Sequence, residues 1–362
     1  MNVLGRFFYL FMQIPLSTYL AASYHPFAIL FTLDESREGI PSRDFPCLEN
    51  NLDRTRLQAR SIKPKIDHQW HPEKAELTIA SRALGQFLEA YPNSIDSVQS
   101  LRLEASPGKS QGHLSKHLER FQNLSALTLM GPFHNLEALN PILSRLEKLE
   151  CIHTRLALED MKALDQCTKL QSLVLIGHVF IREPRHIKPI VPKLGTLKHM
   201  VLGACSAWLL HSLQSQNLPN LECLGLDSSY IDDSDLMALT ALESLRSLAL
   251  RVDHKVRLTS VAPLQSKHLK NLSLCFRGFI TKDSSERFFN YFPALEVLQL
   301  EGNETTAHFY TPSLVGLKAL KTLKLDNVRL HGLQVEKYIF QSKGIQLEYA
   351  AGTKPVQLHS RL

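Results

Sequence analysis

The chain has 362 residues, enough for one elongated domain or two compact ones with a large core. A net charge of +6 is too weak an excess to indicate a nucleic-acid partner, which usually requires a concentrated basic stripe. Six cysteines are scattered without a C-x-x-C pair, which excludes a disulfide framework and indicates small buried thiols in a reduced compartment. They are Cys47, Cys151, Cys167, Cys205, Cys223 and Cys275.

Residues 1–33 form an apolar leader in which Arg6 is the only charged residue. Three interpretations are open: a buried helix pair or leader, a secretory signal peptide cleaved near Ala21 and Ser23, or a membrane anchor. Gln13 and Pro15 interrupt the apolar run and weaken the anchor interpretation. Residues 34–74 contain few apolar side chains and several basic ones, so we expect a linker there.

Residues 75–97 are expected to form a capping segment, because LTIASRALGQFLEAY has the pattern of a strand followed by a helix. Leu84, Phe87, Leu88 and Tyr91 recur at helical spacing and are expected to form its buried face.

A pattern L-x-x-L-x-L then recurs along most of the chain, in steps of 22 to 27 residues. The first residues of the ten matches are Val98, Leu124, Leu146, Leu170, Leu197, Leu221, Leu245, Leu269, Leu295 and Leu320. A degenerate eleventh match follows at Ile345 and Leu347. Ten matches in near-regular register indicate a repeat architecture rather than chance.

Each match alternates apolar and other residues, as a short strand does, and the stretches between matches have helical spacing. LEDMKALDQC places Leu158 to Cys167 on one helical face, and acidic residues precede Leu236 as candidate N-caps. Two further helix starts are predicted, a capping box at Asp283 and Glu286 and an N-cap at Thr311 before Pro312. One strand and one helix cannot bury these leucines alone, so neighbouring units must stack.

The pattern resembles the leucine-rich repeat superfamily. The resemblance implies an α/β solenoid, or horseshoe, over residues 98–350, with parallel strands on the concave face and helices on the convex face. It would contain ten to eleven repeats and end in a tail at residues 351–362.

CTKLQSLVL, from Cys167, is similar to the intracellular class that includes ribonuclease-inhibitor-like proteins and the cysteine-containing repeats of F-box adaptors. Asn303 alone fits the ninth-position asparagine of many extracellular members. The capping segment is similar to that of fungal F-box and leucine-rich-repeat proteins. Ile14–Pro15 stands where an F-box opens, but no acidic residue follows, so the F-box is degenerate, truncated or absent.

Strand residues on the concave face are expected to bind partners, as in many such solenoids. Met130, Ile152 and Ile176 should align on neighbouring strands beside Val174 and Val201. An exposed apolar strip of this kind indicates a protein contact. The alternatives are a local slip of register or a loop that covers the strip.

A basic, proline-stiffened loop runs from Ile181 to Lys193 and contains Arg182, Arg185 and Lys188. It is a candidate contact for an acidic partner, and the alternative is a solvated loop.

No motif of an enzyme is present in the sequence. His113 and His117, like His68 and His71, lack the glutamate and third ligand of a metal site. There is no glycine-rich phosphate loop and no nucleophile elbow, so we expect no catalytic residue, cofactor or metal.

The resemblance therefore implies non-catalytic protein recognition in the cytoplasm or nucleus, without a nucleic-acid partner. The finer expectation is a substrate-recognition adaptor whose N-terminus docks to the core subunit of an SCF-type ubiquitin ligase. The alternatives are a stand-alone inhibitor or scaffold, and a secreted or membrane-tethered repeat protein. Membrane association and oligomeric state stay open.

Overall fold

The computed structural model divides the chain into two compact units, residues 1–68 and residues 69–362. It describes residues 68–71, 75–105, 114–133, 136–180, 193–203, 217–257, 265–276, 287–302, 307–310, 314, 316–331 and 340–349. The leader, most of the linker, the tail, and the predicted caps at Asp283, Glu286, Thr311 and Pro312 lie outside the described residues.

One thirteen-stranded sheet runs through the second unit, with its strands in the order of the chain. Two further strands form a separate two-stranded sheet. From β2 onward, every adjacent pair in the large sheet is parallel. Its strands are β1 (His68–His71), β2 (Glu76–Ala80), β3 (Ser100–Glu104), β4 (Ala126–Met130), β5 (Lys148–Ala157), β6 (Ser172–Phe180), β7 (His199–Leu202), β8 (Cys223–Asp232), β9 (Ser247–Arg257), β10 (Asn271–Phe276), β11 (Val297–Gly302), β13 (Thr322–Asp326) and β15 (Gln346–Tyr349). The small sheet pairs β12 (Ala307–Tyr310) with β14 (Val328–His331).

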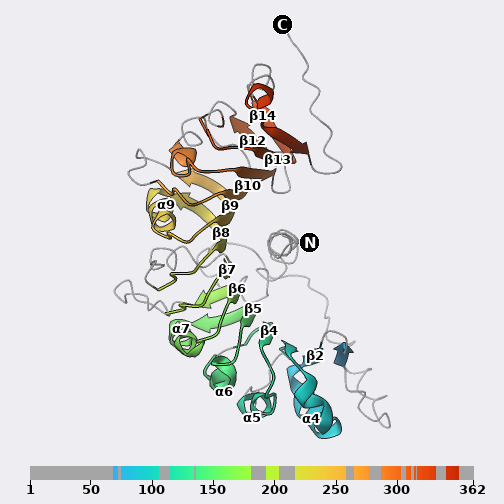
Figure 1. Cartoon of the computed structure of the whole chain (residues 1–362). Helices are drawn as coiled ribbons and strands as arrows, with labels where there is room; N and C mark the ends of the chain where they lie inside the picture. Colours follow the sequence, from blue (N-terminus) through green and yellow to red (C-terminus); the bar gives the residue numbers. More distant parts are fainter. Residues whose placement is uncertain are drawn as a thin grey trace, which may run out of the picture. The chain divides into compact units, whose positions relative to one another are not determined.

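Short helices connect successive strands, and α5, α6, α7 and α9 lie along one side of the sheet (Figure 1). The α-helices are α4 (Leu84–Ala90), α5 (Leu114–Glu119), α6 (Asn140–Leu143), α7 (Leu158–Ala163) and α9 (Asp233–Thr240). The 3-10 helices are η3 (Ser81–Ala83), η4 (Pro92–Ser97), η5 (Leu136–Leu139) and η6 (Leu164–Gln166). Parallel strands in chain order with helices on one side confirm the predicted leucine-rich-repeat solenoid fold.

The leucines of the repeat form the core between strands and helices. All ten first residues of the pattern, from Val98 to Leu320, are buried, none more than 5% exposed. The later leucines of each match also point into the core, as Leu272 and Leu274 do on β10. Alternation along each strand places the residues between them on the opposite face of the sheet.

The capping segment adds β2 in register beside β3, so the parallel sheet begins before the first repeat. Leu84, Phe87 and Leu88 are buried, as predicted for the cap helix. The prediction was wrong for Tyr91, which is 44% exposed. Tyr91 is the C-cap residue of α4, with φ −130° and ψ 56°, so its side chain leaves the helical face.

Helix α9 begins at an acidic N-cap, as predicted, and the structure shows that this cap is a capping box. The Asp232 carboxylate accepts hydrogen bonds from the backbone N–H groups of Ser234 and Asp235, at 2.9 and 3.1 Å. The Asp235 carboxylate accepts in turn from the Asp232 N–H at 3.0 Å. Each carboxylate thereby satisfies an N–H that the first helical turn leaves open.

The turn before each strand ties adjacent repeats together by a set of bonds that we call the pre-strand ladder. One backbone carbonyl accepts from two successive N–H groups of the next repeat: the Lys198 carbonyl accepts from Glu222 and Cys223, and the Glu222 carbonyl from Arg246 and Ser247. Side chains reinforce the ladder, since the Asn220 amide donates to the Gly195 carbonyl at 2.7 Å. Equivalent side-chain donors occur at Asn123, Arg145, Thr196 and Ser244.

Four strands extend beyond the repeat pattern. β5 pairs with β6, and β8 with β9, over nine residues each, with a register shift after Ile152 and after Ser228. His153 adopts a positive φ of 57° at the first of these irregularities. A bulge re-aims the chain and lets pairing continue after the leucine pattern has ended.

Candidate functional site

The candidate site is the sheet face opposite the helices, which we call the concave face. Counting the first residue of each match as one, positions five and seven lie on this face in two rows that cross the strands. The fifth-position row is Arg102, Thr128, Glu150, Val174, Val201, Gly225, Ala249, Ser273, Gln299, Lys324 and Glu348. The seventh-position row is Glu104, Met130, Ile152, Ile176, Gly203, Asp227, Arg251, Cys275, Glu301 and Asp326.

The predicted apolar strip is aligned as expected. Met130 pairs in register with Ile152, and Ile152 with Ile176, while Val174 lies beside Val201. A local slip of register is therefore excluded for these strands.

The strip is less exposed than predicted. Met130 and Ile152 are half-buried, whereas Val174, Ile176 and Val201 are only 6%, 5% and 4% exposed. The expected exposure was wrong for these three. A role for the five residues in binding a partner stays a prediction.

Gly203 marks a close approach between two strands on this face. A Cβ atom at this position would lie 3.2 Å from the Ile176 Cα, closer than side chains normally pack. The lack of a side chain therefore keeps the seventh-position row shallow next to Ile176.

The basic loop residues Arg182, Arg185 and Lys188 lie outside the described residues. Their proposed contact with an acidic partner stays a prediction.

Charged side chains at the N-terminal end of the concave face neutralise one another. Glu150, 8% exposed, accepts a hydrogen bond from Thr128 at 2.9 Å and lies 2.7 Å from the Lys148 ammonium. Arg102 lies 3.8 Å from Glu104, two residues further along the same strand, β3. These carboxylates already have cationic or hydroxyl partners within the chain.

In the C-terminal half of the seventh-position row, acidic side chains outnumber basic ones. Arg251 and Asp227 are buried and face each other at 3.9 Å. Beyond Cys275 follow two neighbouring carboxylates, Glu301 and Asp326, which pair in register on β11 and β13. Burial, followed by the charge of Asp326, raises the pKa of Glu301, and Arg251 offsets part of this shift.

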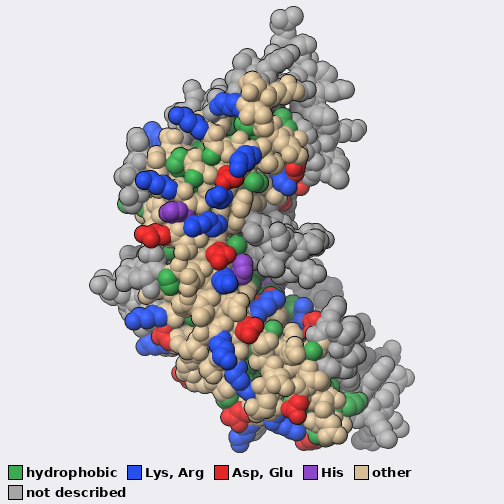
Figure 2. Space-filling model, in the orientation of Figure 1, with side chains coloured by type: hydrophobic (Ala, Val, Ile, Leu, Met, Phe, Trp, Pro, Cys, Tyr) green, Lys and Arg blue, Asp and Glu red, His purple; other side chains and the backbone are tan. Residues whose placement is uncertain are grey.

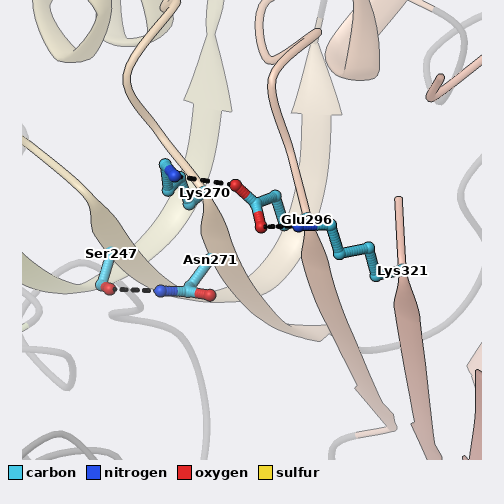
Figure 3. Close-up of polar contacts among 5 residues, drawn as sticks. All are labelled: Ser247, Lys270, Asn271, Glu296 and Lys321. Atoms are coloured by element: carbon cyan, nitrogen blue, oxygen red, sulfur yellow. Dashed lines mark hydrogen bonds and ion pairs between the residues drawn. The ribbon is translucent and has the colours of Figure 1, made fainter. Parts of the chain in front are cut away.

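A separate charged cluster stabilises the pre-strand turns at the same end of the sheet (Figure 3). Glu296 lies between Lys270 at 2.8 Å and Lys321 at 2.6 Å, which belong to the preceding and following repeats. Hydrogen bonds from both ammonium groups lower the pKa of Glu296 to about 2. Next to them, the Asn271 amide donates to the Ser247 hydroxyl at 3.0 Å. These contacts join successive repeats.

Over the visible face in Figure 2, acidic and basic side chains are interspersed, with no broad basic area. Within the part of the chain that the structure describes, no group of three or more His, Cys, Asp or Glu is arranged to hold a metal ion. The helices of those same residues include none long and apolar enough to cross a membrane.

Sequence reasoning singled out neither Glu301 nor Asp326. Their neighbouring positions follow from the repeat register, which was a usable signal. Their half-buried environment, without an ion pair to another described residue, is a property of the folded face and has no signature in the pattern.

No family model matches the chain, and no curated protein matches it. Among solved structures, an internalin from Listeria monocytogenes is 14% identical, with a TM-score of 0.38, over 83% of this chain and 94% of its own. The mouse RP105/MD-1 complex gives 18% identity and a TM-score of 0.40, over 70% of this chain and 45% of the other. The TLR13–ssRNA13 complex gives 20% identity and a TM-score of 0.35, over 74% of this chain and 39% of the other. At such low similarity, the fold assignment rests on the strand pairing itself.

Proposed function

We propose that this chain is a non-catalytic recognition protein that binds a protein partner through its concave face. One observation carries the proposal: leucine fills the core side of nearly every strand, while the other side presents a varied set of polar, charged and apolar residues in register. A stacked array of this kind offers an extended binding surface without a catalytic centre.

The half-buried pair Met130 and Ile152 is the accessible part of the apolar strip and is proposed as a contact for that partner. We test this with Met130→Arg and Ile152→Arg together. The matched control is Gln166→Arg with Asn290→Arg, which adds the same charge at exposed positions of the helix layer. Partners are identified by affinity purification and quantitative mass spectrometry, and circular dichroism confirms that both variants fold.

The Met130→Arg and Ile152→Arg variant is expected to lose the partners that the wild type retains, because an arginine buried against an apolar surface of the partner would have no hydrogen-bond acceptor. The control is expected to keep them. Equal loss in both variants, or full retention in the concave pair, would contradict recognition through this face.

The finer proposal is a substrate-recognition adaptor of the intracellular, ribonuclease-inhibitor-like class, located in the cytoplasm or nucleus. Its N-terminal region would dock to the core subunit of an SCF-type ubiquitin ligase. What supports this is the resemblance of the cap and of the cysteine-containing repeat to F-box and leucine-rich-repeat proteins, together with the reduced thiols Cys151 and Cys167.

The same purification with a form lacking residues 1–60 tests the adaptor proposal. A ligase core recovered with the full chain only would support it. A ligase core absent from both forms would leave a stand-alone inhibitor or scaffold. Recovery of the full chain in a membrane or secreted fraction would favour the alternative in which residues 1–33 act as an anchor or signal.

A further inference from the structure

Two carboxylates on the concave face form no ion pair with another described residue, although Arg251 acts on one of them at longer range. Among the described residues, the ion pairs at this end of the sheet join Arg251 to Asp227 and Lys324 to Glu348, and none includes Glu301 or Asp326. Every other charged side chain in the row lies close to a partner, so these two stand out. The seventh-position row carries four acidic residues and one basic residue in a chain whose net charge is +6.

The two carboxylates are placed to act together. They pair in register on adjacent parallel strands, which lie about 4.8 Å apart, and both side chains are half-buried. Burial, and after it the like charge of Asp326, raises the pKa of Glu301, and Arg251 offsets part of this effect. A cation between them would remove the repulsion.

A second observation points to a ligand at this place. Ser273 is 3% exposed, and its hydroxyl has no hydrogen-bond partner among the described residues, although a buried hydroxyl normally has one. Ser273 occupies the fifth-position row of β10, beside Gln299 on β11, so both side chains face the same side of the sheet as Glu301. A hydroxyl and an amide oxygen add two acceptors to the carboxylate pair.

We propose that Glu301, Asp326, Gln299 and Ser273 form a seat for an arginine side chain of a protein partner. The inference rests on the proposed function and names the chemistry that this part of the concave face recognises. A guanidinium carries five N–H donors in a planar fork, which fits two carboxylates with further oxygen acceptors beside them. A metal ion fits less well, because no group of three or more His, Cys, Asp or Glu among the described residues is arranged to hold one.

The probe is a fluorescein-labelled hexa-arginine peptide, with a hexa-citrulline peptide as its uncharged isostere. Binding to the full-length protein is measured by fluorescence anisotropy at low and high salt. The test variant is Glu301→Gln with Asp326→Asn. The matched control is Glu104→Gln with Glu119→Gln, which removes the same charge from exposed positions at the other end of the solenoid.

The wild type is expected to bind hexa-arginine and not hexa-citrulline. The test variant should bind at least ~10-fold more weakly, whereas the control should change less than about twofold. Gln299→Lys serves as a second variant, because its ammonium would occupy the seat from a neighbouring position, and it should also weaken binding. Thermal unfolding shows whether each variant remains folded.

Three outcomes would overturn the inference: no binding by the wild type, equal weakening in the test and control variants, or displacement of the peptide by millimolar calcium with direct calcium binding. The test also separates this inference from the proposed function. Loss of partners in the Met130 and Ile152 variant, with hexa-arginine binding unaffected by Glu301→Gln and Asp326→Asn, rejects the arginine seat alone. If the Met130 and Ile152 variant keeps its partners and the Glu301 and Asp326 variant loses hexa-arginine binding, the proposed function is rejected and the arginine seat is kept.

Discussion

Four cysteine side chains show how burial fixes the chemistry of single residues in this protein. Cys151, Cys167, Cys223 and Cys275 are free thiols inside the solenoid. Burial is the main cause that raises their pKa values, to about 12 for Cys167, about 11 for Cys223 and about 12 for Cys275. The thiolate is the reactive species, so these thiols should be inert at neutral pH.

We therefore expect these four cysteines to resist iodoacetamide at pH 8 in the native protein and to react fully in urea. Peptide mapping by mass spectrometry resolves each site and separates these cysteines from Cys47 and Cys205, which the structure does not describe. Rapid labelling of Cys167 or Cys275 without unfolding would show that the site opens to solvent.

Glu301 provides a pH-dependent prediction. Its pKa is raised in the fold, so its ionised form is less stable in the folded than in the unfolded chain. The folded wild type therefore loses stability as pH rises through the ordinary glutamate pKa of about 4.3 and beyond, towards the raised value. Glu301→Gln removes this loss, so the variant should have the larger free energy of unfolding at pH 7.

The difference in free energy of unfolding between Glu301→Gln and the wild type should vanish below about pH 4, where Glu301 is protonated in the folded and in the unfolded state. Urea unfolding between pH 4 and 8 measures it, with Glu119→Gln as the control for loss of an exposed carboxylate. A wild type that is more stable than Glu301→Gln at pH 7 would mean that Glu301 has a favourable cation partner within the chain.

At the scale of one element, the pre-strand ladder connects the start of each strand to the repeat before it. The Asn220 side chain donates to the Gly195 carbonyl across this turn. Asn220→Ala leaves that carbonyl to solvent and should lower the free energy of unfolding by about 0.5–1 kcal/mol, because the bond is exposed and competes with water.

Chemical denaturation measures this loss, and Asn290→Ala is the control, since Asn290 is an exposed residue of the helix layer. Equal effects of the two substitutions would show that the side-chain part of the ladder contributes nothing to the stacking of repeats.

The elements that could be predicted are those whose residues repeat. The strands, the cap helix and the capped start of α9 follow from leucine spacing and from Asp232, because burial and capping act locally. The long continuations of β5 and β8 could not be predicted, because HTRLA and SSYID carry no leucine pattern and pair only through a bulge. The exposure of Tyr91 depends on where α4 ends, which spacing alone does not determine.

The candidate site was predictable in its position and less so in its character. Alternation placed Met130, Ile152 and Val174 on one face and in the right register. The degree of burial of Val174, Ile176 and Val201 depends on the side chains around them, which a one-dimensional pattern does not contain.

On the scale of the whole solenoid, each repeat packs only on its neighbours, so stability should spread along the array. Leu248 is fully buried in β9, near the middle of the parallel sheet. Leu248→Ala should cost about 2–5 kcal/mol through lost burial and the cavity left behind. Hydrogen exchange should increase first in β8, β9 and β10 and least in β2 and β3.

Met237→Ala is the control for this prediction, because Met237 is 38% exposed on α9 and leaves no core cavity. Uniform acceleration of exchange from β2 to β15 in Leu248→Ala would instead show that the described solenoid unfolds as a single cooperative unit.

The pre-strand ladder also bears on how the length of such a protein changes over time. From the β2–β3 joint to the β11–β13 joint, each uses the same bonds, a carbonyl shared by two N–H groups, whichever two repeats it connects. Excision of residues 222–245 would join Leu221 to Arg246 and restore an unbroken L-R-S-L-A-L strand at the seam. Gene duplication or loss of one repeat therefore lengthens or shortens the binding surface by one strand, without a new type of joint.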